Sequence, residues 1–282
     1  MSAASEANMT NWTKWMLGGA LGLLGFATVG AAEKLTVPLS DPAKPAEVEV
    51  SLVMGSIQVV GAAVKEVTIE ALSRDEDGDE PEIAGNRERE GMRRIPNTAM
   101  GLEAEEENNK VSISAESWAR AIDLKITVPM ASSVTLSTVN DGDIAVENLD
   151  GELDLHNTNG EIHAKDVKGP VSAATINGDV SITFKRSAAG AAMAFSTLNG
   201  DIDVTFPADF KADVRLRSDN GEIFSDFEVT MNSTKPEIEE KRQGGRYRLV
   251  VAREMTGKIN GGGPEIRLQT FNGDILLRRP KS

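Results

Sequence analysis

One short motif recurs along this 282-residue chain and limits how it can fold: Asn-Gly, then Asp or Glu, then Ile or Val. The copies are centred on Gly160, Gly178, Gly200, Gly221 and Gly273, with Asn140-Asp141-Gly142-Asp143 as a looser one. In the middle of the chain, glycines fall nine residues apart, at 142, 151, 160, 169 and 178. A unit that returns at a fixed spacing is typical of repeat proteins, in which each copy packs on its neighbours.

Each repeat has the pattern of a β-strand that follows a sharp turn. Asn and Gly tolerate positive φ, so the chain can turn there without a steric clash. The second and fourth residues after each glycine are nearly always apolar, and a period of two places them on one face of a strand. The predicted inward residues are Ile144, Leu153, Ile162, Val171, Val180, Ile202, Ile223 and Ile275 at the second place, and Val146, Leu155, Ala164, Ala173, Ile182, Val204, Ser225 and Leu277 at the fourth.

These strands predict an all-β fold. Every copy has the same polarity, which favours a β-solenoid (parallel β-helix-like) built from nine-residue half-coils and Asn-Gly turns. Two half-coils make an eighteen-residue coil with two walls, in which equivalent strands stack in parallel. Asn-Gly is also a strong hairpin signal, so an antiparallel β-sandwich or prism is the alternative.

The composition excludes several classes of function. Lys and Arg total 30 against 44 Asp and Glu, and this net charge of −14 repels the phosphates of nucleic acids. The chain has no cysteine, which removes disulfides, thiolate metal ligands and cysteine nucleophiles. Aromatic residues make up 4% of the chain while 26 residues are Gly, a balance that suits turn-rich β structure.

The first 32 residues have the layout of a signal peptide. Lys14 precedes an uncharged run from Trp15 to Ala32 that ends in small residues, as a signal peptidase requires. An uncleaved membrane anchor is the competing interpretation, but five glycines lower the hydrophobicity of the run. We expect residues 1–32 to be removed, which leaves 33–282 as a single β-repeat domain that is periplasmic, secreted or at the cell surface, without stable membrane insertion.

Alternating residues on both flanks predict further strands. Residues 47–52 and 67–71 alternate polar with apolar side chains, and Gly55-Ser56-Ile57-Gln58-Val59 between them is a degenerate first copy of the repeat. Strands are also expected at 111–114, 124–128 and 247–251. The turn Gly261-Gly262-Gly263-Pro264 returns the chain for its last copy.

Residues 74–110 are rich in charge and lack a sustained apolar period, which predicts a charged, mobile insertion. Asp75, Asp77 and Asp79 alternate like the start of an EF-hand loop. Glu80 stands where that loop needs Gly, and Asn86 stands where it needs Glu. We therefore interpret this segment as a solvated run of charges.

The residue after the turn glycine is acidic in most copies: Asp143, Glu152, Glu161, Asp179, Asp201, Glu222 and Asp274, interrupted by Pro170. In a solenoid these acids would line one edge, where they could hold Ca²⁺. Outward acids at strand starts also simply keep a β protein soluble, and the Gly-Gly-x-Gly-x-Asp pattern of calcium-binding nonapeptides does not occur. His156 and His163 fall at outward positions, and Trp118 belongs to no repeat and suits a cap. We predict no catalytic, cofactor-binding or metal-binding residues.

The phrase Ile126-Thr127-Val128-Pro129, followed by Val134-Thr135-Leu136-Ser137 and the Asn-Gly-Asp-Ile copies, resembles a bacterial family of adhesin-like β-strand-repeat domains of unknown function. The resemblance spans about residues 35–280. It implies an exported or envelope-associated protein, and it brings no catalytic residues.

The sequence therefore favours a non-enzymatic, exported protein that acts as an envelope scaffold or adhesin-like binding surface for an envelope protein or glycan. A polysaccharide lyase or hydrolase on a β-helix is one alternative, for which Lys165 and Lys168 are the only lysines between Gly142 and Ile182. A self-assembling structural protein is the other. The sequence fixes neither the partner nor the oligomeric state.

Overall fold

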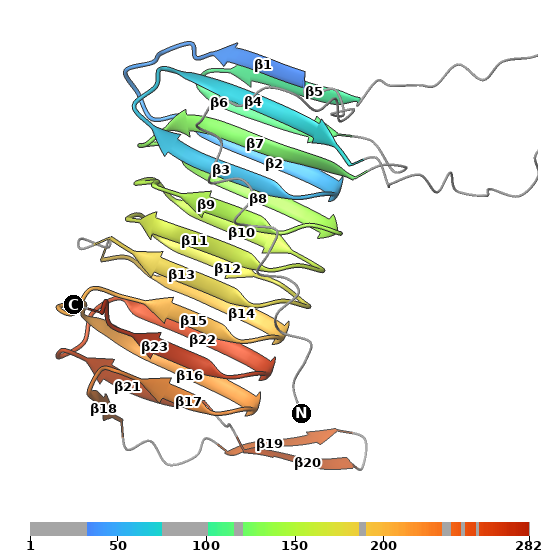
Figure 1. The fold of residues 1–282 in the computed structure, drawn as a ribbon. Helices are drawn as coiled ribbons and strands as arrows, with labels where there is room; N and C mark the ends of the chain where they lie inside the picture. Colours follow the sequence, from blue (N-terminus) through green and yellow to red (C-terminus); the bar gives the residue numbers. More distant parts are fainter. Residues whose placement is uncertain are drawn as a thin grey trace, which may run out of the picture.

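The computed structural model describes residues 33–74, 101–115, 121–185, 190–232, 238–243, 246–251 and 254–281. All regular structure in these residues is β-strand, which confirms the all-β prediction. The strands form two large sheets and one hairpin (Figure 1). The hairpin pairs β19 (Ile238–Gln243) with β20 (Arg246–Val251), as expected for the strand predicted at 247–251. The predicted signal peptide and Trp118 lie outside the described residues.

Both large sheets have mixed strand orientation. In spatial order, sheet A consists of β1 (Glu33–Pro38), β4 (Glu66–Ser73), β7 (Ile122–Pro129), β3 (Ile57–Ala62), β9 (Ile144–Glu147), β11 (Ile162–Val167), β13 (Val180–Phe184), β15 (Ile202–Thr205), β23 (Ile275–Arg278) and β17 (Ile223–Ser225). Sheet B consists of β18 (Val229–Met231), β21 (Met255–Ile259), β16 (Ala212–Asn220), β22 (Glu265–Asn272), β14 (Met193–Asn199), β12 (Val171–Ala174), β10 (Leu153–Asn157), β8 (Ser133–Asn140), β2 (Glu47–Met54), β6 (Lys110–Ala115) and β5 (Leu102–Glu107).

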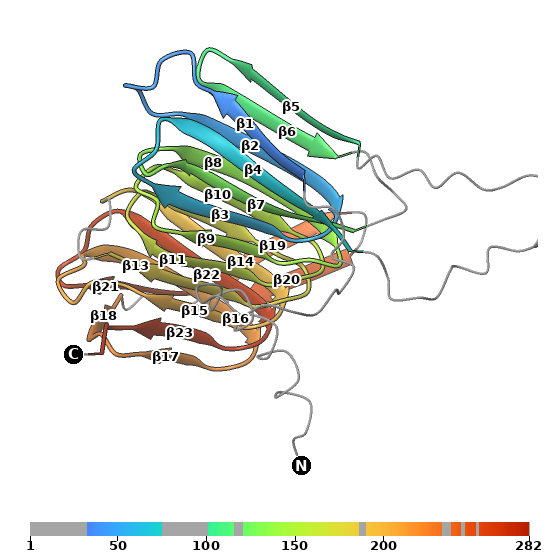
Figure 2. The ribbon, with the colours of Figure 1, turned by 45° about the horizontal axis from the view of Figure 1, so that its top comes forward.

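From β8 to β17 the chain alternates between the two sheets, so that a strand of sheet B and the next strand of sheet A form one rung. Equivalent strands of neighbouring rungs pair in parallel and in register. In sheet A, Ile162 lies opposite Ile144 on one side and Val180 on the other. Among the described strands of the two sheets, antiparallel pairs occur only toward the ends, where β1, β4 and β5 flank one end and β21 and β18 the other (Figure 2).

The order of the rungs in space differs from their order in the chain. The rung β2–β3 lies between β6–β7 and β8–β9, and the rung β22–β23 lies between β14–β15 and β16–β17. In Figure 1, the red strands β22 and β23 are enclosed in this way by orange ones. The second rung from each end is thus built from a terminal segment of the domain. Ile57 and Val59 pair with Ile144 and Val146, which confirms the degenerate first copy.

The predicted inward residues form the core between the sheets. All of them are buried except the two on β17, where Ile223 is partly buried and Ser225 is exposed. Strand β17 is the last strand of sheet A, so its side chains are covered from one side only. The repeat pattern therefore identified the core and failed only at the edge of a sheet.

The predicted insertion at 74–110 is too long, because residues 102–107 form β5. This strand pairs antiparallel with β6, with Leu102 opposite Ala115. Its outward residues are acidic, while Leu102 and Ala104 are partly buried and pack against the core. An edge strand with one half-covered face has little need of large apolar residues, which is why its pattern is weak. Residues 75–100 lie outside the described residues, so the mobility predicted for them stays a prediction.

Candidate functional site

The Asn-Gly turns stack into one edge of the molecule, where strands of sheet B lead into strands of sheet A. In Figure 1 this Asn-Gly edge lies at the arrowheads of β8, β10, β12 and β14. The rungs are in close contact at their glycines: a Cβ on Gly200 would lie 2.1 Å from the carbonyl oxygen of Gly178. Gly200 also has a φ of 155°, so the position requires glycine on both counts.

The asparagines of the motif form a hydrogen-bonded ladder along this edge. In each neighbouring pair, the side-chain amide nitrogen of one asparagine donates to the amide oxygen of the other, over 2.7–3.0 Å. In spatial order the ladder consists of Asn140, Asn159, Asn177, Asn199, Asn272 and Asn220. Stacked amide ladders of this kind fix the register of parallel strands, because a shift by one residue would break every bond.

A second ladder lies beneath the first and uses buried hydroxyl groups. The Thr197 side chain donates to the carbonyl oxygen of Gly178 over 2.9 Å, and Thr270 donates to that of Gly200 over 3.0 Å. Other rungs make the equivalent bond, with Thr138, Thr175, Ser218 or Asn157 as donor. These bonds satisfy turn carbonyls that would otherwise have no partner in the interior.

The acids of the motif form a third set, which we call the acid row: Asp143, Glu161, Asp179, Asp201, Asp274 and Glu222. Several of their carboxylates accept a hydrogen bond from the backbone N–H of the acid on the next rung, at 2.7 Å from Asp201 to Asp179 and from Asp274 to Asp201. Asp143 and Asp274 accept equivalent bonds from the backbone N–H groups of Glu161 and Glu222. Each of these carboxylates keeps its second oxygen for other partners.

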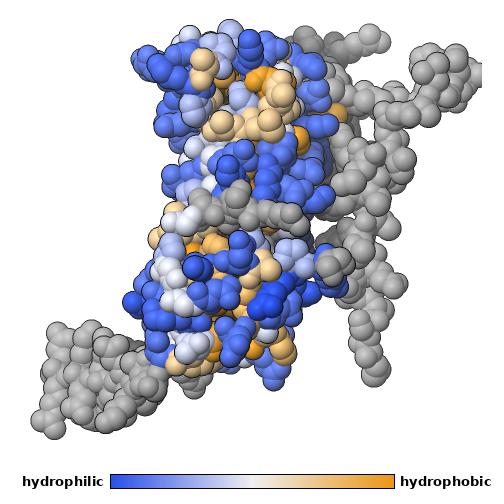
Figure 3. All heavy atoms as spheres, turned by 90° about the vertical axis from the view of Figure 1, so that its left-hand side faces the viewer, coloured by the Kyte–Doolittle hydropathy of each residue, from blue (hydrophilic) through white to orange (hydrophobic). Residues whose placement is uncertain are grey.

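The acid row differs from the predicted one in one respect, because the seven acids do not share one edge. Glu152 precedes β10 and Pro170 precedes β12, so both lie where sheet A leads into sheet B. Nine residues make half a coil, and therefore every second glycine belongs to the opposite edge. Figure 3 shows that edge, where hydrophilic side chains cover most of the described surface and apolar ones form small groups.

Two neighbouring members of the acid row, Asp179 and Glu161, have pKa values shifted in opposite directions. Burial raises the pKa of the Asp179 carboxyl above its usual 3.8, and the like charges of Asp201 and Glu161 contribute to the rise. A hydrogen bond from His163 lowers the pKa of Glu161, whose carboxylate lies 2.8 Å from Nε2 of that histidine. Asp179 thus has a stacked carboxylate on each side, and His163 is paired with one of them, Glu161.

Beside the asparagine ladder, a line of exposed apolar side chains follows the same edge. We call it the apolar row: Val53, Val139, Ile176, Leu198 and Phe271, with exposed fractions of 38–47%. Strand register places Val53 beside Val139 and Leu198 beside Phe271, and Thr158 fills the place between Val139 and Ile176. This row was not predicted from the sequence. Its signal is an exposed apolar residue directly before the Asn in four copies, at positions 139, 176, 198 and 271.

The other candidate residues do not come together. His156 lies on sheet B with Nε2 3.0 Å from Asp154, whereas His163 lies on sheet A, so the two histidines face opposite sides. Lys165 lies 3.6 Å from Glu147 on the outer face of sheet A, and Lys168 lies in a turn of the edge opposite the acid row. Within the residues that the structure describes, no three His, Asp or Glu side chains could hold a metal ion together.

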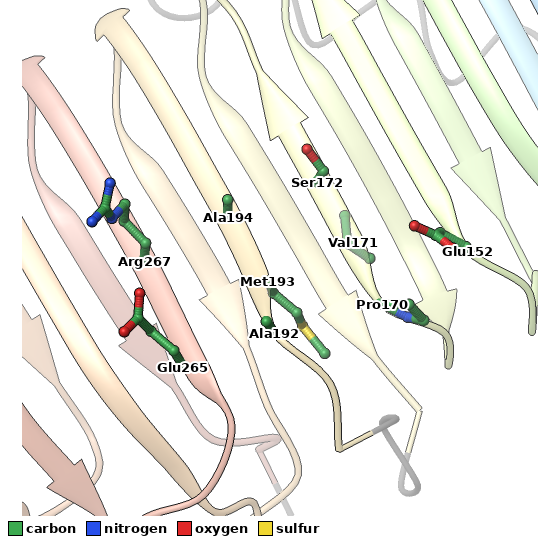
Figure 4. A pocket seen from close by; sticks show the side chains of 9 residues that line it. All are labelled: Glu152, Pro170, Val171, Ser172, Ala192, Met193, Ala194, Glu265 and Arg267. Atoms are coloured by element: carbon green, nitrogen blue, oxygen red, sulfur yellow. The ribbon is translucent and has the colours of Figure 1, made fainter.

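A shallow hollow on the outer face of sheet B has a volume of about 330 Å³ (Figure 4). Small side chains, including Ser172, Ala192 and Ala194, lie between Glu152 on one side and Glu265 and Arg267 on the other. Glu265 is already paired with Arg215, Nε to Oε2, at 2.9 Å. The hollow is open to solvent and lacks the convergent, enclosed polar groups of an enzyme pocket.

Three solved structures resemble this chain at low sequence identity. A putative cell adhesion protein from Clostridium sporogenes is 10% identical, with a TM-score of 0.47 over 89% of this chain and 100% of its own. A putative adhesin from Bacteroides fragilis is 12% identical, with a TM-score of 0.38 over 91% and 100%. A putative lipid binding protein from Parabacteroides distasonis is 9% identical, with a TM-score of 0.29 over 89% and 98%.

No curated protein matches the chain. In the described part of the chain, no helix has the length and apolar character needed to cross a membrane. The sequence profile of a known family, however, matches residues 10–278, and this confirms the resemblance that the Asn-Gly copies indicated. The chain therefore belongs to the Toastrack DUF4097 family.

Proposed function

We propose that the protein is an exported, non-enzymatic β-solenoid that acts as an envelope scaffold or adhesin-like binding surface, and that it binds through its Asn-Gly edge. The observation that carries this proposal is the apolar row. Single exposed apolar residues are common on protein surfaces, but several aligned along one edge favour an interaction site. Here five of them occur at equivalent positions of six successive rungs.

The solenoid part of the proposal is supported by the parallel pairing of equivalent strands in both sheets. Such a stack is stiff, because every rung is hydrogen-bonded to the next through strands and turns alike. The rungs repeat about every 4.8 Å, the distance between paired strands. A partner that binds along the edge therefore meets the same group at regular intervals.

A binding assay with purified envelope fractions tests the proposal. We expect labelled protein comprising residues 33–282 to bind saturably, and a Leu198→Ser/Phe271→Ser variant to lose most of this binding. Phe224→Ser is the matched control, since Phe224 is a 48% exposed phenylalanine on the outer face of sheet A, outside the apolar row. Equal binding by all three proteins would contradict a role for the Asn-Gly edge.

Two further measurements address the rest of the proposal. Mass spectrometry of the protein from its native host should find a mature N-terminus near Ala32, and a protein that retains residues 1–32 would contradict export by cleavage. Incubation with polyuronates and neutral glycans, with and without Ca²⁺, should produce no new reducing ends and no unsaturated products. Turnover that disappears in a Lys165→Ala or Asp179→Ala variant would establish the enzymatic alternative instead.

A further inference from the structure

The apolar row has the dimensions of a single helix. It spans six rungs from β2 to β22, which is five intervals of about 4.8 Å, or about 24 Å in all. A helix of about 16 residues has this length, and its apolar residues at i, i+3 or i+4 recur about every 5.4 Å. Over five intervals the two repeats drift apart by only about 3 Å, a difference that side chains can take up.

The acid row gives this surface a charge. In three turns an acid lies three residues after the apolar residue, as Asp179 does after Ile176, and the same spacing separates 198 from 201 and 271 from 274. Asp143 lies four residues after Val139. In the part of the chain that the structure describes, no Lys or Arg forms an ion pair with a member of the acid row. The repulsion among these acids, which contributes to the raised pKa of Asp179, would be relieved by a cation from outside.

These charges decide between the possible occupants. A second copy of the chain would place one acid row against another, and an anionic lipid surface or polyanionic glycan would be repelled in the same way. The area of the apolar row also favours a single helix over a second copy of the chain. A strip about 24 Å long and about 10 Å wide covers about 240 Å², far below the roughly 800 Å² per partner of a stable protein–protein interface, but suited to one helix.

We propose that the partner of the Asn-Gly edge is a cationic amphipathic helix of about 16 residues. This proposal rests on the proposed function of the edge as a binding surface. The apolar stripe of the helix lies on the apolar row, and its Lys and Arg side chains face the acid row. This is the helix-in-groove mode of peptide recognition, with a line of side chains in place of the groove. The rigid rungs supply the spacing, and the helix supplies the complementary charge.

A synthetic 18-residue peptide of Leu and Lys, with Leu at helical spacing, is a direct probe. By fluorescence anisotropy we expect saturable binding to residues 33–282, with a gain of helicity by circular dichroism. A peptide of the same composition with alternating Leu and Lys has strand periodicity and should bind at least tenfold more weakly. A Leu/Glu peptide with helical spacing should not bind.

Variants of the protein separate the two parts of the interaction. Leu198→Ser/Phe271→Ser should weaken peptide binding at least tenfold, whereas Phe224→Ser should change it less than twofold. Asp201→Asn/Asp274→Asn should weaken peptide binding about threefold or more. It should also make binding less sensitive to salt, because salt screens the attraction of these two carboxylates for the peptide and the variant lacks them. Binding that ignores peptide periodicity, or that survives loss of the apolar row, would overturn the proposal.

The experiment also distinguishes failure of this inference from failure of the proposed function. If envelope binding is lost in Leu198→Ser/Phe271→Ser but the helical peptide neither binds nor competes, the edge is a binding surface with a partner of another class. If envelope binding is unaffected by these substitutions, the proposed function itself is wrong.

Discussion

The order of the rungs can be tested by cross-linking, because the chain contains no cysteine of its own. Ser196 on β14 lies opposite Gln269 on β22, and Gln269 in turn lies opposite Arg217 on β16. All three residues are on the outer face of sheet B. The pair Ser196→Cys/Gln269→Cys should therefore form a disulfide, since neighbouring strands are about 4.8 Å apart and a disulfide joins Cα atoms about 4.4–6.8 Å apart.

The size of the effect follows from the loop that the bond closes. Residues 196 to 269 make a loop of about 74 residues, and the loss of chain entropy in the unfolded state is then worth up to about 4.5 kcal/mol. Urea unfolding monitored by circular dichroism, with and without a reducing agent, measures the difference. Native-state strain reduces the gain, so we expect a stabilisation of about 2–4 kcal/mol that is lost on reduction.

The matched control is Ser196→Cys/Arg217→Cys, in which the two residues are close in the chain but two strands apart in space. Their Cα atoms are separated by about 9.6 Å, too far for a disulfide without backbone movement. We expect this pair to stay reduced under the same oxidising conditions. If it cross-links and the Ser196–Gln269 pair does not, the repeats stack in chain order, and our description of the fold is wrong.

Three further predictions concern stability. Val180→Ala should lower the free energy of unfolding by about 2–3 kcal/mol, because it removes two buried methyl groups, which account for about 1.6 kcal/mol, and leaves a cavity. Ser181→Ala on the outer face should change the free energy of unfolding by less than about 0.5 kcal/mol. Equal effects of the two substitutions in urea unfolding would show that the strand register is wrong. Thr197→Val should cost about 1–3 kcal/mol, because the buried carbonyl of Gly178 loses its donor, and a value near zero would contradict the role of the hydroxyl ladder. The raised pKa of Asp179 means that ionisation of its carboxyl group destabilises the folded state at pH values above that pKa. Asp179→Asn should therefore raise the melting temperature at pH 7, and the gain should vanish as the pH falls toward 3.8, the usual pKa of the group. A gain in melting temperature that persists at pH 3 would refute this cause.

Much of the fold was predictable because its repeats obey simple periodicities. The period of two after each glycine identified the buried residues from Ile144 to Val204, and the Asn-Gly pairs identified the turns. The division of the acids between two edges was also implicit, since units of nine residues alternate between walls. The prediction that placed Glu152 on the same edge as the other acids was wrong, because Glu152 lies half a coil away from them.

The order of the rungs, by contrast, could not be read from the motif. The copies at Gly221 and Gly273 are nearly identical, so both would stack on the copy at Gly200 equally well by local pattern. The choice depends on contacts far apart in the chain: β21 returns antiparallel beside β16 and leaves the place next to β14 for β22. The apolar row was overlooked for a different reason, because an apolar residue next to Asn resembles an ordinary strand end.

The placement of β22–β23 also determines when the molecule can be completed. Strands β14 and β16 are joined through β22, so until residues 265–278 are available, both strands present an open edge where a rung is missing. These residues are synthesised after the strands on both sides of the gap. The central rungs can assemble from contiguous chain, but the rung β22–β23 can dock only after β14 to β17 and β21 have already been made. Folding at this end of the molecule therefore cannot follow the order of synthesis rung by rung.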